Sequence, residues 1–131
     1  LRGPIPRGVG EESPAPHSGD TEGRAGDILA RPELKLLAVS DQAGVYLAAT
    51  PDGRRVFVTG HPEYDRLTLK AEYDRDVAAG KRIAVPANYF PGDDPAREPL
   101  MTWRSHAHLL YANWLNYCVY QETPYDLNQL R

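Results

Sequence analysis

Three strand-like runs lie so close together in this chain that they restrict how it can fold. They are LKLLAVS (34–40), VYLAAT (45–50) and RRVFVTG (54–60), and their apolar, partly β-branched composition favours strands. Only DQAG (41–44) separates the first run from the second, and PDGR (51–54) leads from the second into the third, both typical of tight turns. Because short turns join antiparallel neighbours, we expect an antiparallel meander or an edge extension of a larger sheet.

Two amphipathic stretches follow these runs. Residues 65–80 predict a helix with Asp65 as its N-cap and Gly80 just past its end. Its apolar residues recur four apart on one face: Leu69, Tyr73 and Val77. Residues 105–121 predict a second helix with Ser105 as its N-cap. Apolar residues cover most of the circumference of this second helix, which indicates burial on more than one side.

The other segments are rich in proline and glycine. Residues 1–26 hold ten Pro or Gly residues and predict an irregular lead, which divides the chain into 1–26 and 27–131. Residues 81–104 carry four prolines and cannot form regular structure throughout. A coil of that length inside a compact domain is expected to wrap the surface or to shape a site.

The composition excludes several classes of function. The net charge is −3, with 15 basic and 18 acidic residues, so no basic excess points to nucleic acid. No apolar run approaches the roughly 20 residues needed to cross a bilayer. Cys118 is the only cysteine, which excludes an internal disulfide and fits a reducing cytoplasm. Residue 1 is Leu and the only methionine is Met101, so we expect the chain to begin partway through a longer one.

The third strand-like run ends at Gly60 and leads into His61, Pro62 and Glu63. Side chains two residues apart in an extended segment point to the same side, so His61 and Glu63 are expected to lie together. Pro62 fixes its own φ and favours an extended conformation at the preceding residue. A carboxylate beside an imidazole orients it and stabilises its cation. The pair therefore suits a general base with its orienting acid, although the motif contains no nucleophile.

Four motifs together resemble a known enzyme family. They are GHPEYD (60–65), EYDRDV (72–77), NYFPGDDP (88–95) and WRSHAHLLYANWLNYCVYQETPYDL (103–127). This set is similar to the C-terminal part of the homoserine O-acyltransferases, the O-acetyltransferases and O-succinyltransferases built on a class I glutamine amidotransferase-like fold. The likeness runs from about residue 13 to residue 127.

The resemblance implies an α/β fold and a ping-pong acyl transfer. The fold would be a three-layer α/β/α sandwich, flavodoxin-like, of which this chain is the C-terminal part. A cysteine of the family takes an acyl group from acetyl-CoA or succinyl-CoA as a thioester and passes it to the hydroxyl of L-homoserine. These enzymes act in methionine biosynthesis in the cytoplasm, and the complete protein is expected to be a homodimer. No metal, bound cofactor, nucleic acid or membrane is implied.

The resemblance also assigns roles to four residues of this sequence. His61 falls on the catalytic histidine and Glu63 on the glutamate that orients it. Arg75 falls on an arginine that binds the amino-acid substrate, and a guanidinium offers two parallel donors to a carboxylate. Ser18, in APHS, falls on a serine near the substrate. Without the resemblance, Arg75 is typical of a solvated surface charge, since aspartates flank it on both sides.

Some features depart from the family or carry no chemistry. The nucleophilic cysteine, a substrate-binding lysine and the residue that governs the choice of acyl-CoA all lie upstream of the matching part. Residues 1–12 match poorly, and Gly19 stands where the family usually has arginine. Cys118 lies among apolar neighbours in a predicted helix, where cysteine is mostly a small hydrophobic residue, and the family usually has tyrosine there. His106 and His108 face different directions on the same predicted helix and are a poor metal pair.

Two alternatives to the acyltransferase interpretation stay open. One is a non-catalytic remnant or interaction module that keeps the same fold and has lost the nucleophile. The other is a different cysteine-dependent, amidotransferase-like enzyme. A cysteine-bearing α/β part ahead of residue 1 would discriminate the enzyme from the remnant. Expressed alone, the chain is expected to be poorly stable or self-associating, because the second predicted helix has more apolar surface than this segment can cover.

Overall fold

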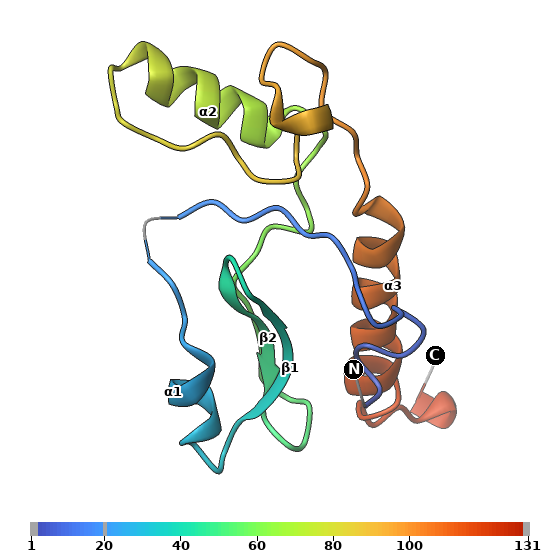
Figure 1. Ribbon diagram of the computed structural model, residues 1–131. Helices are drawn as coiled ribbons and strands as arrows, with labels where there is room; N and C mark the ends of the chain where they lie inside the picture. Colours follow the sequence, from blue (N-terminus) through green and yellow to red (C-terminus); the bar gives the residue numbers. More distant parts are fainter. Residues whose placement is uncertain (1–2, 20, 130–131) are drawn as a thin grey trace.

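A small antiparallel sheet and two longer helices form the framework of the chain (Figure 1). The computed structural model describes residues 3–19 and 21–129, and the fold is mixed α/β. Among these described residues no helix is both long and apolar enough to cross a membrane. The elements in chain order are α1 (Ala25–Leu29), β1 (Lys35–Ser40), β2 (Gly44–Ala49), β3 (Val56–Val58), α2 (Thr68–Ala78), the 3-10 turn η1 (Pro91–Asp93), α3 (Arg104–Trp114), the π-helical turn η2 (Leu115–Tyr120) and the 3-10 turn η3 (Leu127–Gln129).

The three strands form the predicted meander. The order is β1-β2-β3, both pairings are antiparallel, and Leu47 of β2 lies opposite Ala38 on one side and Val58 on the other. The backbone N–H of Gln42 donates to the hydroxyl of Ser40 at 3.2 Å and tightens the first turn. The meander prediction is therefore confirmed, with β1 and β3 as the edges of the sheet in the described part of the chain.

Gly44 opens β2 at a position where only glycine fits. Its φ is +72°, and a Cβ there would lie 2.5 Å from the carbonyl oxygen of Gly23. That same carbonyl accepts a hydrogen bond of 2.8 Å from the N–H of Val45. The end of the lead is thereby joined to the sheet, and it continues directly into α1, a helix that we did not predict.

The sheet packs against α3 through one apolar cluster, the sheet core, which consists of the buried residues Ile5, Leu47, Ala49 and Leu110. Asn113 of α3 is buried and donates through Nδ2 to the carbonyl oxygens of Ile5 at 2.9 Å and Arg7 at 2.7 Å. These bonds satisfy backbone groups that would otherwise be buried without partners. Part of the irregular lead therefore belongs to the core.

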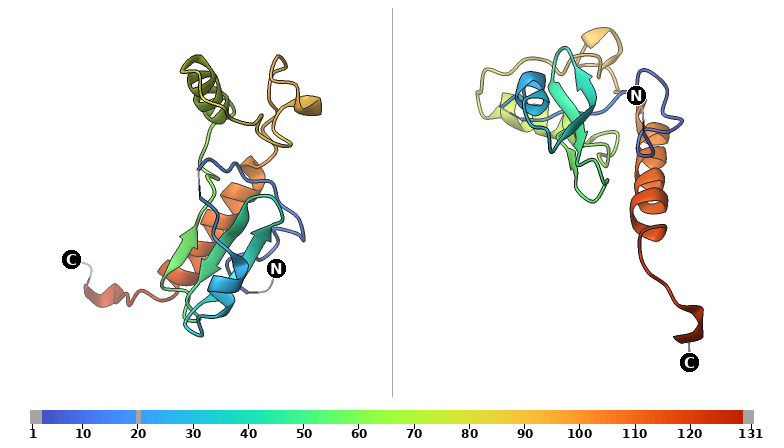
Figure 2. Two further views of the ribbon diagram at one scale, coloured as in Figure 1. Left: turned by 60° about the vertical axis from the view of Figure 1, so that its left-hand side comes forward. Right: turned by 90° about the horizontal axis from the view of Figure 1, so that it is seen from below.

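The helix predicted at residues 105–121 is found, with two differences. It begins at Arg104 with Trp103 rather than Ser105 at the N-cap, and from Leu115 the last turn is π-helical. Burial on more than one side proves wrong within the described residues. Only Ala107, Leu110 and Asn113 are buried, whereas Tyr111, Trp114 and Leu115 expose 41%, 37% and 37% of their surface. These three side chains are thus only partly covered by the described residues, and the stretch after η2 extends away from the molecule (Figure 2).

Helix α2 packs on the long coil instead of the sheet, as Figure 1 shows. The contact is a second cluster, the aromatic core, formed by the buried residues Leu69, Tyr89, Phe90 and Trp103. Tyr73 packs against this core, but Val77 is largely exposed, so the predicted three-residue apolar face is shorter than expected. The coil at 81–103 therefore covers α2, as a long coil in a compact domain must if it is to bury apolar surface.

The two ends of α2 show one confirmed and one wrong prediction. Gly80 has φ +73°, and its N–H donates to the carbonyl of Val77. The N–H of Lys81 donates to the carbonyl of Asp76, and the two bonds together form a Schellman motif. Asp65, in contrast, is not the N-cap. The hydroxyl of Tyr89 accepts from the N–H of Lys70 at 3.1 Å instead. A side chain from the coil thus replaces the local cap.

Candidate functional site

The turn after β3 brings His61 and Glu63 together. His61 Nδ1 and Glu63 Oε1 are 2.9 Å apart, and the side chains are 33% and 55% exposed. A carboxylate bonded to Nδ1 leaves Nε2 as the free ring nitrogen, the arrangement required of an imidazole that accepts a proton from a substrate group. The local geometry can therefore support general acid–base chemistry.

The lead passes over this turn at Pro16. The N–H of His61 donates to the carbonyl oxygen of Pro16 at 2.7 Å. A Cβ on Gly60 would lie 2.9 Å from that carbonyl and 2.9 Å from Nε2 of His17, so the close approach requires glycine. The segment that contains Ser18 is consequently held against the start of the HPE motif, residues 61–63, which forms the HPE turn.

His17 lies beside the candidate pair. Its ring meets that of Tyr46 edge to face, with 5.5 Å between centroids. Burial, and then the charge of nearby His61, lower the pKa of His17, which favours a neutral ring. Burial, followed by the neighbouring Tyr111 and Glu63, raises the pKa of Tyr46 to about 12, so this phenol keeps its proton.

Glu72 of α2 lies next to the candidate pair and is a candidate site residue to which no role was assigned from the sequence. Its Oε1 accepts a hydrogen bond of 2.7 Å from the hydroxyl of Tyr64, and its Oε2 is buried with no hydrogen-bond partner among the described residues. Burial by itself would raise the pKa of Glu72. The hydroxyls of Tyr64 and Ser18 and the charges of Arg75 and His61 outweigh burial and lower it. Glu72 is therefore an ionised group with one oxygen that lacks a partner in the described part of the chain.

The spacing of Glu72 and Arg75 could have revealed this residue. Positions three apart on a helix lie on neighbouring parts of one face, so an acid and a base one turn apart offer opposite charges to the same ligand. Arg75 itself is 66% exposed, and its Nε donates to Asp76 at 2.9 Å. Ser18 is exposed near Glu72 and Tyr64. The structure thus groups all four predicted site residues around the HPE turn and α2.

Cys118 lies elsewhere and lacks the properties of a nucleophile. It packs against the sheet core, and burial, followed by the charge of Glu122, raises the pKa of its thiol. A reactive cysteine requires the opposite shift. Within residues 3–19 and 21–129, no three His, Cys, Asp or Glu side chains gather as a metal site.

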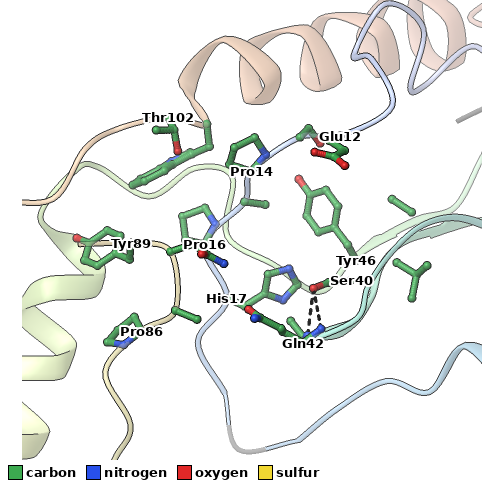
Figure 3. A pocket seen from close by; sticks show the side chains of 18 of the residues that line it. Glu12, Pro14, Pro16, His17, Ser40, Gln42, Tyr46, Pro86, Tyr89 and Thr102 are labelled. Carbon is green, nitrogen blue, oxygen red and sulfur yellow. Dashed lines mark hydrogen bonds between the residues drawn. The ribbon is translucent and has the colours of Figure 1, made fainter. Parts of the chain in front are cut away.

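A separate cavity of about 750 Å³ lies between the lead, β1 and the coil (Figure 3). His17 and Tyr46 contribute to its wall, together with Pro16 and Tyr89. His61 and Glu63 are not among its lining residues, so the cavity adjoins the candidate site without containing the His–Glu pair.

Comparison with known proteins gives a consistent result. The sequence model described as homoserine O-succinyltransferase matches residues 2–125, so the likeness begins earlier than residue 13, where we expected it. Homoserine O-acetyltransferase of Brevibacillus brevis is 65% identical over 113 residues, which are 86% of this chain and 37% of that protein. The Thermotoga petrophila protein of the same name is 57% identical over 116 residues, 88% of this chain and 38% of that protein. That of Desulfitobacterium hafniense is 56% identical over 124 residues, 95% of this chain and 40% of that protein.

The chain thus spans well under half the length of these curated relatives. The family match nevertheless covers nearly all of its own residues and includes the HPE turn, α2, the coil and α3. This chain belongs to the homoserine O-succinyltransferase family.

Proposed function

We propose that this chain is the C-terminal part of a homoserine O-acyltransferase of methionine biosynthesis. The observation that carries the proposal is the His61–Glu63 pair at 2.9 Å, next to a helix that presents Glu72 and Arg75 one turn apart. The substrates are L-homoserine and an acyl-CoA. We favour acetyl-CoA over succinyl-CoA because the relatives named above are homoserine O-acetyltransferases.

The chemistry assigned to this chain is proton transfer. A cysteine thiol from another part of the enzyme gives its proton to His61 Nε2 and attacks the thioester carbonyl of the acyl-CoA. The CoA thiolate leaves with that proton, and the cysteine holds the acyl group. His61 then takes the proton of the homoserine hydroxyl as its oxygen attacks the new thioester, and returns it to the departing cysteine. Glu63 keeps Nδ1 protonated and the ring in position throughout.

Glu72 and Arg75 are the groups we assign to the amino-acid part of homoserine. The guanidinium suits the α-carboxylate, which it can bind through two parallel hydrogen bonds. The unpaired Oε2 of Glu72 suits the α-ammonium group. The contact of Arg75 with Asp76 uses Nε, which leaves the two terminal nitrogens for the carboxylate of the substrate. Ser18 is assigned a place near the bound substrate.

The fold of the complete enzyme is part of the same proposal. We expect the meander and the two helices to form the C-terminal side of a three-layer α/β/α sandwich, whose other layers include the nucleophile. The exposed residues Tyr111, Trp114 and Leu115 support this, because apolar side chains on one helix face need a covering partner. A cytoplasmic homodimer with no bound cofactor is the expected state of the complete protein.

A chimera tests the function directly. Residues of this chain replace the matching part of the Brevibacillus brevis enzyme, and acyl transfer is followed by CoA release and by O-acyl-homoserine formation. We expect an active chimera in which His61→Ala lowers kcat by about 10²–10⁴-fold. The matched control is His108→Ala, an exposed histidine of α3, which should retain full activity. A folded chimera without activity, or one unaffected by His61→Ala, would contradict the proposal.

A non-catalytic module of the same fold is the second candidate. In such a module no thiol would act as the nucleophile, and Cys118, which packs against the sheet core and has a raised pKa, is unsuited to that role. If the chimera folds yet neither releases CoA nor acylates homoserine with acetyl-CoA or succinyl-CoA, this second candidate becomes the better account.

A further inference from the structure

Tyr64 contacts both halves of the candidate site. Its ring lies nearly parallel to the imidazole of His61, with 4.4 Å between centroids and 14° between planes. Its hydroxyl donates to Oε1 of Glu72 at 2.7 Å. One side chain therefore connects the HPE turn, which carries the base, to α2, which carries the charges assigned to the substrate.

The backbone of Tyr64 is fixed from the other side by the aromatic core. The indole Nε1–H of Trp103 donates to the carbonyl oxygen of Tyr64 at 3.0 Å, and the Tyr64 side chain packs against that core. The N–H of Tyr64 donates to the carbonyl of His61 at 3.1 Å, which closes the turn. A rigid cluster thus sets the position of the tyrosine ring.

The His–Glu pair needs such support. Both side chains are partly exposed, and exposed charged pairs contribute little free energy toward holding a fixed geometry. Rotation of the imidazole would break its contact with Glu63. A parallel aromatic ring at van der Waals distance restricts that rotation without competing for either ring nitrogen.

Glu72 needs support of a different kind. The side chain is partly buried, its Oε2 is fully buried, and only Oε1 has a hydrogen-bond partner among the described residues. The hydrogen bond from Tyr64 fixes that oxygen, and it thereby fixes the direction in which the free oxygen points.

We propose that Tyr64 is a positioning residue. Its ring holds the base His61, and its hydroxyl holds the carboxylate of Glu72, which we assign to binding of the substrate ammonium group. The assignment rests on the proposed acyltransferase function. It predicts that the two contacts can be separated by substitution, because phenylalanine keeps the ring and removes the hydroxyl, whereas leucine removes both.

Kinetics of the chimera described above test the separation. Tyr64→Phe should raise KM for homoserine about tenfold, the usual effect of losing a hydrogen bond to a charged group, and leave kcat within about twofold. Tyr64→Leu should also lower kcat by at least about tenfold, because a displaced base is costly. The control Tyr73→Leu removes another tyrosine that packs against the aromatic core. Apart from its effect on stability, it should change neither KM for homoserine nor kcat. Unchanged KM in Tyr64→Phe, or unchanged kcat in Tyr64→Leu, would overturn the assignment.

A readout without substrate separates this inference from the proposed function. In the chimera without substrate, ¹⁵N spectra of the imidazoles should show His61 as a single Nδ1–H tautomer in the parent and in Tyr64→Phe, but as a mixture in Tyr64→Leu. A ¹³C titration should show a higher Glu72 pKa in Tyr64→Phe, since a hydrogen bond to the charged form is lost. If both spectral responses are seen but the parent chimera is inactive, the acyltransferase proposal is overturned and the role of Tyr64 stands. If the parent chimera is active but the spectral responses are absent, the role of Tyr64 is overturned.

Discussion

The region around the sheet and the region around α2 are stabilised in different ways. In the sheet region, β1–β3 and α3 meet in the sheet core, and apolar residues remain exposed on α3. In the α2 region, α2 and the coil at 81–103 meet in the aromatic core, and side-chain hydrogen bonds from Tyr89 and Trp103 fix the backbone. In the described part of the chain, the first region has two unpaired strand edges and exposed apolar residues on α3. In the second region the coil covers the inner face of α2, although Val77, Ile83 and Leu100 stay exposed.

The two regions differ in how they hold the candidate site. The part of the candidate site that contains His61 and Glu63 lies on residues 60–64, which connect the two regions. Tyr64, at the end of this segment, is fixed by the aromatic core. His61, near its start, is held by Pro16 of the lead, which in turn depends on the sheet region. We therefore expect covering protein to stabilise the sheet region more than the α2 region.

The largest expected effect comes from Trp103→Ala. Trp103 is 3% exposed, and its removal leaves a cavity in the aromatic core and the carbonyl of Tyr64 without its donor. Replacements of this kind cost about 3–5 kcal/mol. Amide hydrogen exchange should show loss of protection in α2 while β2 stays protected. Trp114→Ala, on the exposed side of α3, should cost under ~1 kcal/mol. Equal loss of protection in both regions would show that they unfold as one unit.

A smaller effect is expected from Asn113→Ala in the sheet region. The change leaves the carbonyl oxygens of Ile5 and Arg7 without their shared donor, at a cost of about 2 kcal/mol. Urea unfolding followed by fluorescence should show the loss, and exchange should localise it to α3 and β2. Asn116→Ala, an exposed position of η2, is the control and should be near neutral. Loss of protection in α2 instead would contradict the division into two regions.

The smallest effect concerns Asp76, at the end of α2. Hydrogen bonds from Arg75 and then Lys81 lower the pKa of Asp76 from 3.8 to about 2. Because the folded pKa is depressed, its contribution to stability is present above the ordinary pKa and is lost as the pH falls through about 2. Wild type should therefore be slightly more stable than Asp76→Asn near neutral pH, and the difference should shrink below about pH 4 and vanish below about pH 2. If the stability difference persists at low pH, the effect of Asp76→Asn comes from packing and not from the charge of Asp76.

Local patterns predicted most of the regular structure. The strands followed from composition and short turns, and the end of α2 followed from Gly80, because each depends on neighbours in the sequence. The N-cap of α2 could not be predicted in this way. Tyr89, far along the coil, supplies the group that we had assigned to Asp65. The exposed side of α3 was misjudged because apolar content predicts a need for cover and not its presence.

The residues of the candidate site also differ in whether neighbours in the sequence or distant residues determine their contacts. The closeness of His61 and Glu63 was predicted from an extended conformation, but a turn closed by the N–H of Tyr64 on the carbonyl of His61 brings them together instead. Glu72 was missed because its importance depends on Tyr64, which reaches it from a different element. The contact of Pro16 with His61 has no signal in spacing at all, since it joins two irregular segments.

That last contact has a consequence for the order of folding. Pro16 and His61 are distant in sequence, so the loop between them is costly to close in an unfolded chain. Formation of the meander shortens that loop, because each hairpin returns the chain on itself. We therefore expect the hydrogen bond at His61 to form late, after β2 has paired on both sides. Slow refolding of the sheet would then delay assembly of the site even when α2 is already in place.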